Sequence, residues 1–282
     1  MLYCSPGPGG QPGQIGPVAH SGEPDIATAH DQPYLSVVLP CYNEERRLPE
    51  TLHTVGEFLQ GRPYSSEIIV VDDGSTDGTA DVVTRLAANN PFIRLIRNEH
   101  RGKAFTVRTG MLDAAGQYIL FTDADGATPI SEVDKLLRPL EAGCDVAIAS
   151  REGVGARRFG EPWHRHLMGR VFNMIVRLFA LPGIHDTQCG FKCFRRDAAQ
   201  DLFRGMRLYS DSGGAVRGAL LTGFDVEILF LARKWGYRIA EVPVSWYYGS
   251  ESKVSPIKDS WRNLRDVLLV RWNDLMGRYR RS

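Results

Sequence analysis

Two aspartates separated by a single residue follow a short apolar segment near the middle of the chain. Residues 117–121 read Gln-Tyr-Ile-Leu-Phe, and Asp123 and Asp125 come soon after them. Ligands of open α/β sheets bind outside the carboxyl ends of the strands, so a strand that ends here would present both carboxylates to a ligand. Hard oxygen ligands of this kind suit Mg²⁺ or Mn²⁺, with substrate phosphates completing the coordination. The alternative is a surface turn with two solvated aspartates.

A second acidic pair follows another apolar segment further upstream. Residues 67–71 carry a β-branched run, which is typical of a strand buried on both faces of a parallel sheet. Asp72 and Asp73 come directly after this run. Gly74 then permits a tight turn and the close approach of a ligand. Both acidic pairs are therefore expected at the same edge of one sheet.

The elements that must position these carboxylates can be read from the pattern around them. A third apolar segment, residues 35–39, also ends in a polar loop. Apolar segments that alternate with helical stretches predict a βαβαβ arrangement with a parallel sheet. Helices are expected over residues 44–60, 77–89, 102–115 and 129–142, and further strands over residues 145–151 and 239–244. The expected fold class is α/β, with a Rossmann-like, mostly parallel central sheet flanked by helices. A Rossmann dehydrogenase is disfavoured, because no G-x-G-x-x-G follows the first strand.

Charge and composition divide the chain into three parts. The 282 residues are 43% hydrophobic and 24% charged, with a net charge of +1, so there is no global signature of nucleic-acid binding. Residues 1–33 are rich in Gly and Pro and are expected to be a disordered tail. Residues 34–250 form the expected catalytic domain, and residues 251–282 a basic, helical C-terminal tail. Two alternatives stay open for this tail, which are contact with a phospholipid surface and a solvated helix face.

The cysteines and the hydropathy of the chain indicate where in the cell the protein is expected. The five cysteines are odd in number, and their spacing lacks a disulfide or zinc pattern, which favours a reduced protein. No apolar run approaches the roughly 18 to 20 residues needed to span a bilayer. We therefore expect a cytoplasmic location, and a peripheral position on the inner face of the membrane stays open.

Taken in order, the motifs resemble glycosyltransferase family 2 with a GT-A fold. Within that family the chain is most similar to dolichyl-phosphate (polyprenyl-phosphate) β-glucosyltransferases and to mannosyl-phosphodolichol synthases. The resemblance covers residues 35–258. Its motifs are P-x-Y-N-E (40–44), D-D-G-S-x-D-x-T (72–79), R-G-K (101–103), D-A-D (123–125), S-R (150–151), D-x-Q-C-G-F-K (186–192), F-D-x-E (224–227) and S-K (252–253).

The resemblance implies a nucleotide-sugar donor and a divalent metal, Mg²⁺ or Mn²⁺. Asp125 is the expected direct metal ligand, and Asp123 is expected at the ribose or in the metal's water shell. A metal held there would stabilise the negative charge that develops on the leaving diphosphate. The residues expected to bind the nucleotide sugar are Pro40, Tyr42, Glu44, Asp72, Asp73, Gly74, Lys103, Asp123 and Gln188.

The resemblance also implies a polyprenyl or dolichyl phosphate as acceptor. The phosphate oxygen is already ionised, so cations that hold phosphates matter more than a strong general base. The cations expected to do this are Arg151, Arg157, Arg158, Lys192 and Lys253, and for each the alternative is an ordinary surface cation. Asp225 and Glu227 are expected near the acceptor, where they would orient the sugar or act as base on a hydroxyl. Their alternative is a helix N-terminus that favours acidic residues.

The expected reaction is inverting transfer of a hexose to the lipid phosphate, with Asp125, Asp225, Glu227 and Arg151 as catalytic residues. Residues 126–129 read Gly-Ala-Thr-Pro, as in the glucosyl branch, which favours UDP-glucose over GDP-mannose. Three alternatives stay open: a mannosyltransferase, a family 2 enzyme with a glycan hydroxyl as acceptor, and a nucleotide-binding protein without turnover. The last is disfavoured, because the paired aspartates repel one another unless a cation lies between them.

Overall fold

The computed structural model describes residues 4–5, 32–162, 170, 174, 176–177, 180–208, 223–249 and 256–281, without the side chains of residues 4–5 and 256–263. Most of the expected N-terminal tail lies outside the described residues. The predicted phosphate-binding residue Lys253 lies outside them too. No helix in the described part is long and apolar enough to cross a membrane.

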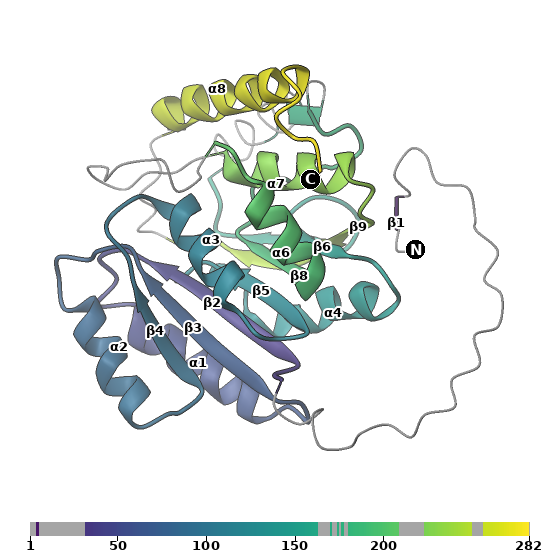
Figure 1. The fold of residues 1–282 in the computed structure, drawn as a ribbon. Helices are drawn as coiled ribbons and strands as arrows, with labels where there is room; N and C mark the ends of the chain where they lie inside the picture. Colours follow the sequence, from purple (N-terminus) through teal and green to yellow (C-terminus); the bar gives the residue numbers. More distant parts are fainter. Residues whose placement is uncertain are drawn as a thin grey trace, which may run out of the picture.

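A twisted central sheet runs through the molecule (Figure 1). Its strand order is β1-β9-β6-β8-β5-β2-β3-β4. The bounds are β1 Cys4–Ser5, β2 Leu35–Cys41, β3 Ser66–Asp72, β4 Ile93–Arg97, β5 Tyr118–Thr122, β6 Val146–Ser150, β8 Phe191–Arg195 and β9 Ile239–Pro243. A small second sheet pairs β7 (Arg157–Phe159) with β10 (Ser245–Tyr247). The expectation of a mostly parallel sheet is confirmed.

Strand direction decides which loops meet. β2 is parallel to both β3 and β5, and β3 is parallel to β4, so the carboxyl ends of these four strands lie at one edge of the sheet. β8 runs antiparallel to β5, with Phe191 opposite Thr122. The segment that enters β8 therefore lies beside the segment that leaves β5. The sequence indicates a strand after the polar turn at residue 186 but not its antiparallel direction, because a buried strand has the same side-chain pattern in either direction.

Helices cover both faces of the sheet (Figure 1). Ile69 and Val71 of β3 pack on the face covered by α3, α6 and α7, and Ile68 and Val70 pack on the face covered by α1, α2 and α4. This two-sided burial explains the unbroken β-branched run. The bounds are α1 Leu48–Gln60, α2 Thr79–Ala88, α3 Lys103–Asp113, η1 Ile130–Glu132, α4 Val133–Glu141, α6 Arg196–Gly205, α7 Phe224–Lys234 and α8 Pro256–Leu275.

The cysteines correct one expectation. Cys41, Cys189 and Cys193 are buried free thiols, as a reduced protein requires. Cys144, however, is disulfide-bonded. The expectation of a chain without disulfide bonds is therefore wrong at this residue. Spacing along the sequence could not reveal the bond, because pairing depends on which segments the fold brings together.

Candidate active site

Five loops and one helix N-terminus converge at the carboxyl edge of β2, β3, β4 and β5. They comprise residues 41–47, 72–78, 98–102, 123–129 and 186–190, and the start of α7. Backbone hydrogen bonds join them, including Asn98 N to Asp72 O at 2.8 Å and Asp123 N to Gly190 O at 3.1 Å. This is the edge at which open α/β sheets bind ligands.

Asp72 presents a buried oxygen that lacks a partner. The residue is fully buried, and its Oδ1 accepts hydrogen bonds from the backbone N–H and the hydroxyl of Ser75. Among the described residues, nothing donates a hydrogen bond to its Oδ2. A buried carboxylate oxygen without a donor is costly, so this atom favours a ligand that carries N–H or O–H groups. A ribose or a nucleobase meets that requirement.

Asp73 holds a neighbouring loop in place. Its carboxylate accepts the backbone N–H groups of Arg101 and Gly102, each at 2.9 Å, and lies 2.7 Å from Nδ1 of His100. Gly74 has φ +69° and a Cβ there would lie 2.9 Å from the backbone nitrogen of His100, so a side chain at position 74 would displace the loop. Asp73 and Gly74 thus build the wall of the site.

Tyr42 joins this wall through its ring. The ring stacks on that of His100, with centroids 4.0 Å apart and an interplanar angle of 6°. Glu44 forms an ion pair with Arg47 at 2.8 Å, and its backbone N–H donates to the Thr79 hydroxyl. Pro40 is buried within β2. The structure brings the predicted nucleotide-binding residues of the β2 and β3 loops together.

The two aspartates of D-x-D follow β5 and face Lys103. Nζ of Lys103 lies 2.5 Å from Oδ1 of Asp123. Oδ1 of Asp125 accepts the backbone N–H of Ala127 at 3.0 Å. Burial, together with the negative charge of Asp123, raises the pKa of Asp125. A Cβ at Gly190 would overlap the Asp123 carboxylate, so a side chain there would displace that carboxylate.

These residues fit a divalent cation. Burial, and then the charge of Asp123, raise the pKa of Asp125, so ionised Asp125 is unfavourable here without a further cation. No cluster of three or more His, Cys, Asp or Glu side chains suited to a metal occurs in the described part of the chain. Mg²⁺ is usually held by only one or two carboxylates together with substrate phosphates. Asp123 and Asp125 match that mode.

A buried ion pair joins β8 to α7 close to the two aspartates of D-x-D. Nζ of Lys192 is 2.6 Å from Oδ1 of Asp225 and also donates to the carbonyl oxygen of Cys189. Lys192 stands opposite Phe121 in the β5–β8 ladder, and its ammonium lies 5.3 Å from the centre of that ring. Burial lowers the pKa of Lys103, but the charges of Asp123 and Asp225 outweigh it and raise the pKa. Lys103, Asp123, Asp125, Lys192 and Asp225 therefore form one interacting group, called here the acidic cluster.

Arg151 forms a second buried ion pair, with Asp186. Its Nε and Nη2 donate to Oδ2 and Oδ1 of Asp186 at 2.7 and 2.9 Å. Burial opposes ionisation of Asp186, but the Arg151 guanidinium holds the pKa of that carboxyl well below its usual range. Glu241 positions Asp186 by accepting its backbone N–H at 2.8 Å, and it also accepts the hydroxyl of Ser150.

Sequence reasoning did not assign roles to Asp186 and Glu241. Asp186 was visible as the first residue of D-x-Q-C-G-F-K, a motif that already carried the resemblance. Glu241 lies in β9 and gives no local signal, because its partners at positions 150, 185 and 186 are remote in the sequence. Gln188 is half-buried next to Asp186, whose Oδ1 accepts the Gln188 backbone N–H at 3.2 Å.

Other predicted residues lie elsewhere or are already paired. Glu227 is fully buried on the side of α7 away from Asp225, since residues two apart on a helix do not share a face. Its Oε1 accepts the backbone N–H of Arg207 and the Tyr279 hydroxyl, both at 2.7 Å. Arg158 is paired with Glu152 and Glu161, and Arg157 is exposed in β7.

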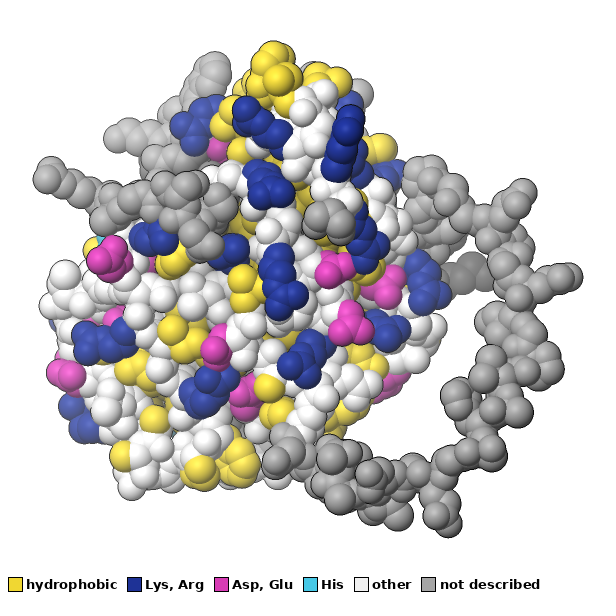
Figure 2. Space-filling model, in the orientation of Figure 1, with side chains coloured by type: hydrophobic (Ala, Val, Ile, Leu, Met, Phe, Trp, Pro, Cys, Tyr) yellow, Lys and Arg dark blue, Asp and Glu magenta, His cyan; other side chains and the backbone are white. Residues whose placement is uncertain are grey.

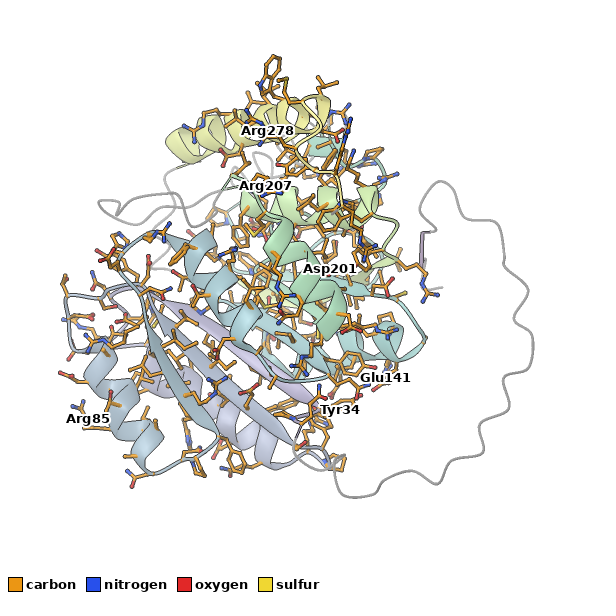
Figure 3. All side chains as sticks on the ribbon, viewed as in Figure 1. Tyr34, Arg85, Glu141, Asp201, Arg207 and Arg278 are labelled. Carbon is orange, nitrogen blue, oxygen red and sulfur yellow. The ribbon has the colours of Figure 1, made fainter. Side chains whose placement is uncertain are left out.

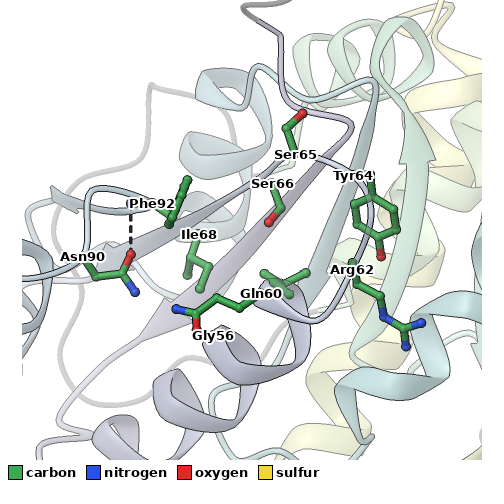
Figure 4. A pocket seen from close by; sticks show the side chains of 10 residues that line it. Gly56, Gln60, Arg62, Tyr64, Ser65, Ser66, Ile68, Asn90 and Phe92 are labelled. Carbon is green, nitrogen blue, oxygen red and sulfur yellow. Dashed lines mark hydrogen bonds between the residues drawn. The ribbon is translucent and has the colours of Figure 1, made fainter.

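A cavity at the opposite edge of the sheet contains none of the predicted site residues. Its volume is about 250 Å³. It lies between the end of α1 and the start of β3, where Gln60, Ser66 and Phe92 contribute to its lining (Figure 4). The amino ends of parallel strands are not where α/β sheets bind ligands. The acidic cluster therefore remains the candidate active site.

Comparison with known proteins identifies the family of this chain. The family model for glycosyl transferase family 2 matches residues 36–203. Dolichyl-phosphate beta-glucosyltransferase of Dictyostelium discoideum is 35% identical over 265 residues, covering 88% of this chain and 76% of the relative. The enzymes of the same name from Saccharomyces cerevisiae and Homo sapiens are 36% and 34% identical and cover 88% and 87% of this chain, and 77% of each relative.

Solved structures share the fold. The mannosyltransferase PcManGT of Pyrobaculum calidifontis, in complex with GDP-Man and Mn²⁺, matches with a TM-score of 0.54 at 22% identity, covering 87% of this chain and 65% of that chain. Glucosyl-3-phosphoglycerate synthase of Mycobacterium tuberculosis, in complex with Mn²⁺, UDP and its product, matches with a TM-score of 0.57 at 19% identity, covering 87% and 80%. The expected GT-A fold is confirmed, and the chain belongs to glycosyl transferase family 2.

Proposed function

We propose that this protein transfers glucose from UDP-glucose to a polyprenyl or dolichyl phosphate, with inversion at the sugar and with Mg²⁺ or Mn²⁺ bound at Asp123 and Asp125. The relatives named dolichyl-phosphate beta-glucosyltransferase support the sugar and the acceptor class. The observation that carries the proposal is the acidic cluster beside the unpaired oxygen of Asp72, at one edge of the sheet.

Asp72 and Lys103 are proposed to bind the nucleotide-sugar donor. Its free Oδ2 accepts a hydrogen bond from the base or ribose, and the Asp73-held loop carries Lys103 toward the diphosphate. Asp125 would ligate the metal directly, and Asp123 would lie at the ribose or in the metal's water shell. When bound, the metal neutralises charge on the departing diphosphate. Lys103 exchanges its contact with Asp123 for a phosphate oxygen, which keeps the ammonium paired.

Charge explains why metal and substrate depend on each other. Lys103 and Lys192 contribute two positive charges to the acidic cluster, and Asp123, Asp125 and Asp225 contribute three negative charges, a net −1. One divalent cation changes this to +1, which attracts an anionic diphosphate. Donor binding should therefore require the metal.

The two buried ion pairs are proposed to position the lipid-phosphate acceptor. A lipid phosphate is already ionised, so it needs positioning rather than deprotonation. The Lys192–Asp225 pair within the acidic cluster and the Arg151–Asp186 pair each hold a cation in place. Each cation also keeps a carboxylate partner when no substrate is bound. Gln188, next to Asp186, then lines the space for the hexose. Arg157 and Lys253 remain candidates for an outer phosphate contact.

Calorimetric titration with donor tests the proposal directly. UDP-glucose should bind in the presence of Mn²⁺ and lose measurable affinity when a chelator is added, and GDP-mannose should bind more weakly. Preference for GDP-mannose would assign the protein to the mannosyl branch instead. Donor binding that does not respond to the chelator would overturn the metal assignment.

A further inference from the structure

One face of α8 presents apolar side chains to solvent. Leu268, Trp272 and Leu275 are 54%, 56% and 77% exposed, and Leu269 and Met276 extend the same face. They recur at intervals of three, four and seven residues, which places them on one stripe of the helix. This stripe, called here the outer face of α8, covers the upper end of the molecule in Figure 2. Clustered exposed apolar residues of this kind mark an interaction surface.

The opposite face of α8 is fixed to the domain, so the outer face is not exposed by chance. Val267 and Val270 are fully buried among the core residues that cover one face of the sheet, and Asn273 is buried beside them. The chain after α8 also folds back, and the Tyr279 hydroxyl donates to Glu227 of α7. Rotation of α8 to hide its outer face would break these contacts.

Arginines lie on α8 and in the segment that follows it. Arg265 and Arg271 lie on α8 itself, and Arg278, Arg280 and Arg281 follow it. Figure 3 shows Arg278 at this end of the molecule, next to Arg207. Asp266 pairs with Arg265 at 3.3 Å, and Asp274 pairs with Arg271 at 3.8 Å and with Lys234 at 2.5 Å. These two carboxylates leave the five arginines in excess. An apolar stripe with a tryptophan, bordered by arginines, matches the interface of an anionic bilayer.

A hydrogen bond joins α8 to the start of α7, which carries part of the active site. The buried carboxylate of Asp266 accepts the backbone N–H of Gly223 at 2.9 Å. Gly223 is the residue before α7, and Asp225 of the acidic cluster lies in the first turn of that helix. The face that would meet lipid and Asp225, the partner of Lys192 in the acidic cluster, are therefore on two directly packed helices (Figure 1).

We propose that the outer face of α8 lies in the interfacial layer of an anionic phospholipid membrane and thereby presents the lipid-phosphate acceptor to the acidic cluster. The inference that the bound lipid is the acceptor rests on the proposed function. A symmetric dimer through the same face is disfavoured, because it would place the arginines of one copy against those of the other.

Co-flotation of the full chain with vesicles tests the proposal. The chain should float with vesicles of phosphatidylcholine and phosphatidylglycerol, and not with vesicles of phosphatidylcholine alone. The double variant Trp272→Glu, Leu275→Glu should bind the anionic vesicles at least about tenfold more weakly, since it removes two large apolar side chains from the interface. Arg271→Glu should weaken binding roughly fivefold or more, and added salt should do the same.

A matched control carries the same charge change elsewhere. Phe92 and Val154 are 53% and 99% exposed and lie outside α8, so Phe92→Glu, Val154→Glu should leave vesicle binding unchanged. Equal loss of vesicle binding in both double variants would overturn the proposal. Flotation that does not depend on the charge of the lipid would overturn it as well. A wild-type dimer in sedimentation that only the α8 variant abolishes, without vesicle binding, would assign the face to a second copy instead.

Turnover with a short-chain, water-soluble isoprenyl phosphate separates this proposal from the proposed function. The α8 variant should keep that turnover and lose turnover with long-chain acceptor embedded in vesicles. If the wild type binds vesicles but turns over neither acceptor, the membrane surface stands and the proposed reaction fails. Equal turnover of the vesicle-embedded acceptor by wild type and α8 variant would contradict the role of α8.

Discussion

Asp72 is the residue whose environment points most directly to a ligand. Its Oδ2 is buried and accepts no hydrogen bond from the described residues, whereas its Oδ1 accepts one from the Ser75 hydroxyl. Replacement Asp72→Asn puts an N–H group where an acceptor is required, and should weaken UDP binding by about 10- to 100-fold, the effect of losing a hydrogen bond to a charged group. Calorimetry with UDP and Mn²⁺ measures this. Asp81→Asn, on the exposed side of α2, is the matched control, and equal affinities for the two variants would contradict the assignment.

Asp125 should show opposite effects on activity and stability. Burial and the charge of Asp123 raise its pKa, so its ionised form is unfavourable in the folded protein without metal. Asp125→Asn should lower kcat by about 10² to 10³, the scale for loss of charge stabilisation in a transition state. The same change should leave Tm unchanged or raise it at pH 7 without metal. Loss of Tm together with activity would mean that Asp125 is a structural residue.

At the scale of elements, the strands were predictable and their neighbours were not. The apolar runs that became β2, β3, β5, β6 and β9 were identified within a residue or two, because burial on both faces leaves a clear pattern. The antiparallel direction of β8 was not identified. The hydrogen bond that Glu241 accepts from Asp186, in the segment before β8, was not identified either. Such features depend on contacts between remote residues, which one sequence does not display.

Within the site, sequence patterns located side chains but not their orientations. Asp72 and Asp73 are neighbours, yet one has a free oxygen and the other holds the loop of residues 100–102. Asp225 and Glu227 belong to one motif, yet they lie on different sides of α7, and Glu227 contacts the end of the chain through Tyr279. Their separate catalytic roles remain predictions.

The segment that enters β8 should depend on ionisation of Asp186. Its folded-state pKa is lowered by Arg151 despite burial, so its stabilising effect is full above the usual pKa of 3.8 and is lost as the pH falls below that value. Asp186→Asn should reduce the free energy of unfolding by about 3 to 5 kcal/mol at pH 7, because Arg151 is left buried without a partner. The difference from wild type should shrink as the pH approaches about 3. Urea unfolding across this range, with exposed Asp197→Asn as control, measures it, and a pH-independent difference would contradict the pairing.

At the scale of the whole molecule, the distribution of charge matters more than the net charge of +1. Carboxylates that we propose hold a divalent cation lie at the carboxyl edge of the sheet, and arginines and exposed apolar side chains lie together at the end of the chain. The sequence indicated the basic tail but left its partner open, since a basic helix can equally be a solvated surface. The structure adds that α8 is packed through one side and exposed through the apolar one.

The most direct test of the account is transfer of labelled glucose from UDP-glucose to a polyprenyl phosphate, followed by extraction of the lipid. The account predicts a labelled glucosyl lipid phosphate that forms with Mn²⁺ or Mg²⁺, disappears with chelator and is absent when GDP-mannose is the only donor. Asp125→Asn should form this product about 10² to 10³ times more slowly than wild type. Metal-dependent transfer to a glycan hydroxyl with no labelled lipid, or lipid labelling that persists in chelator, would contradict the central claim.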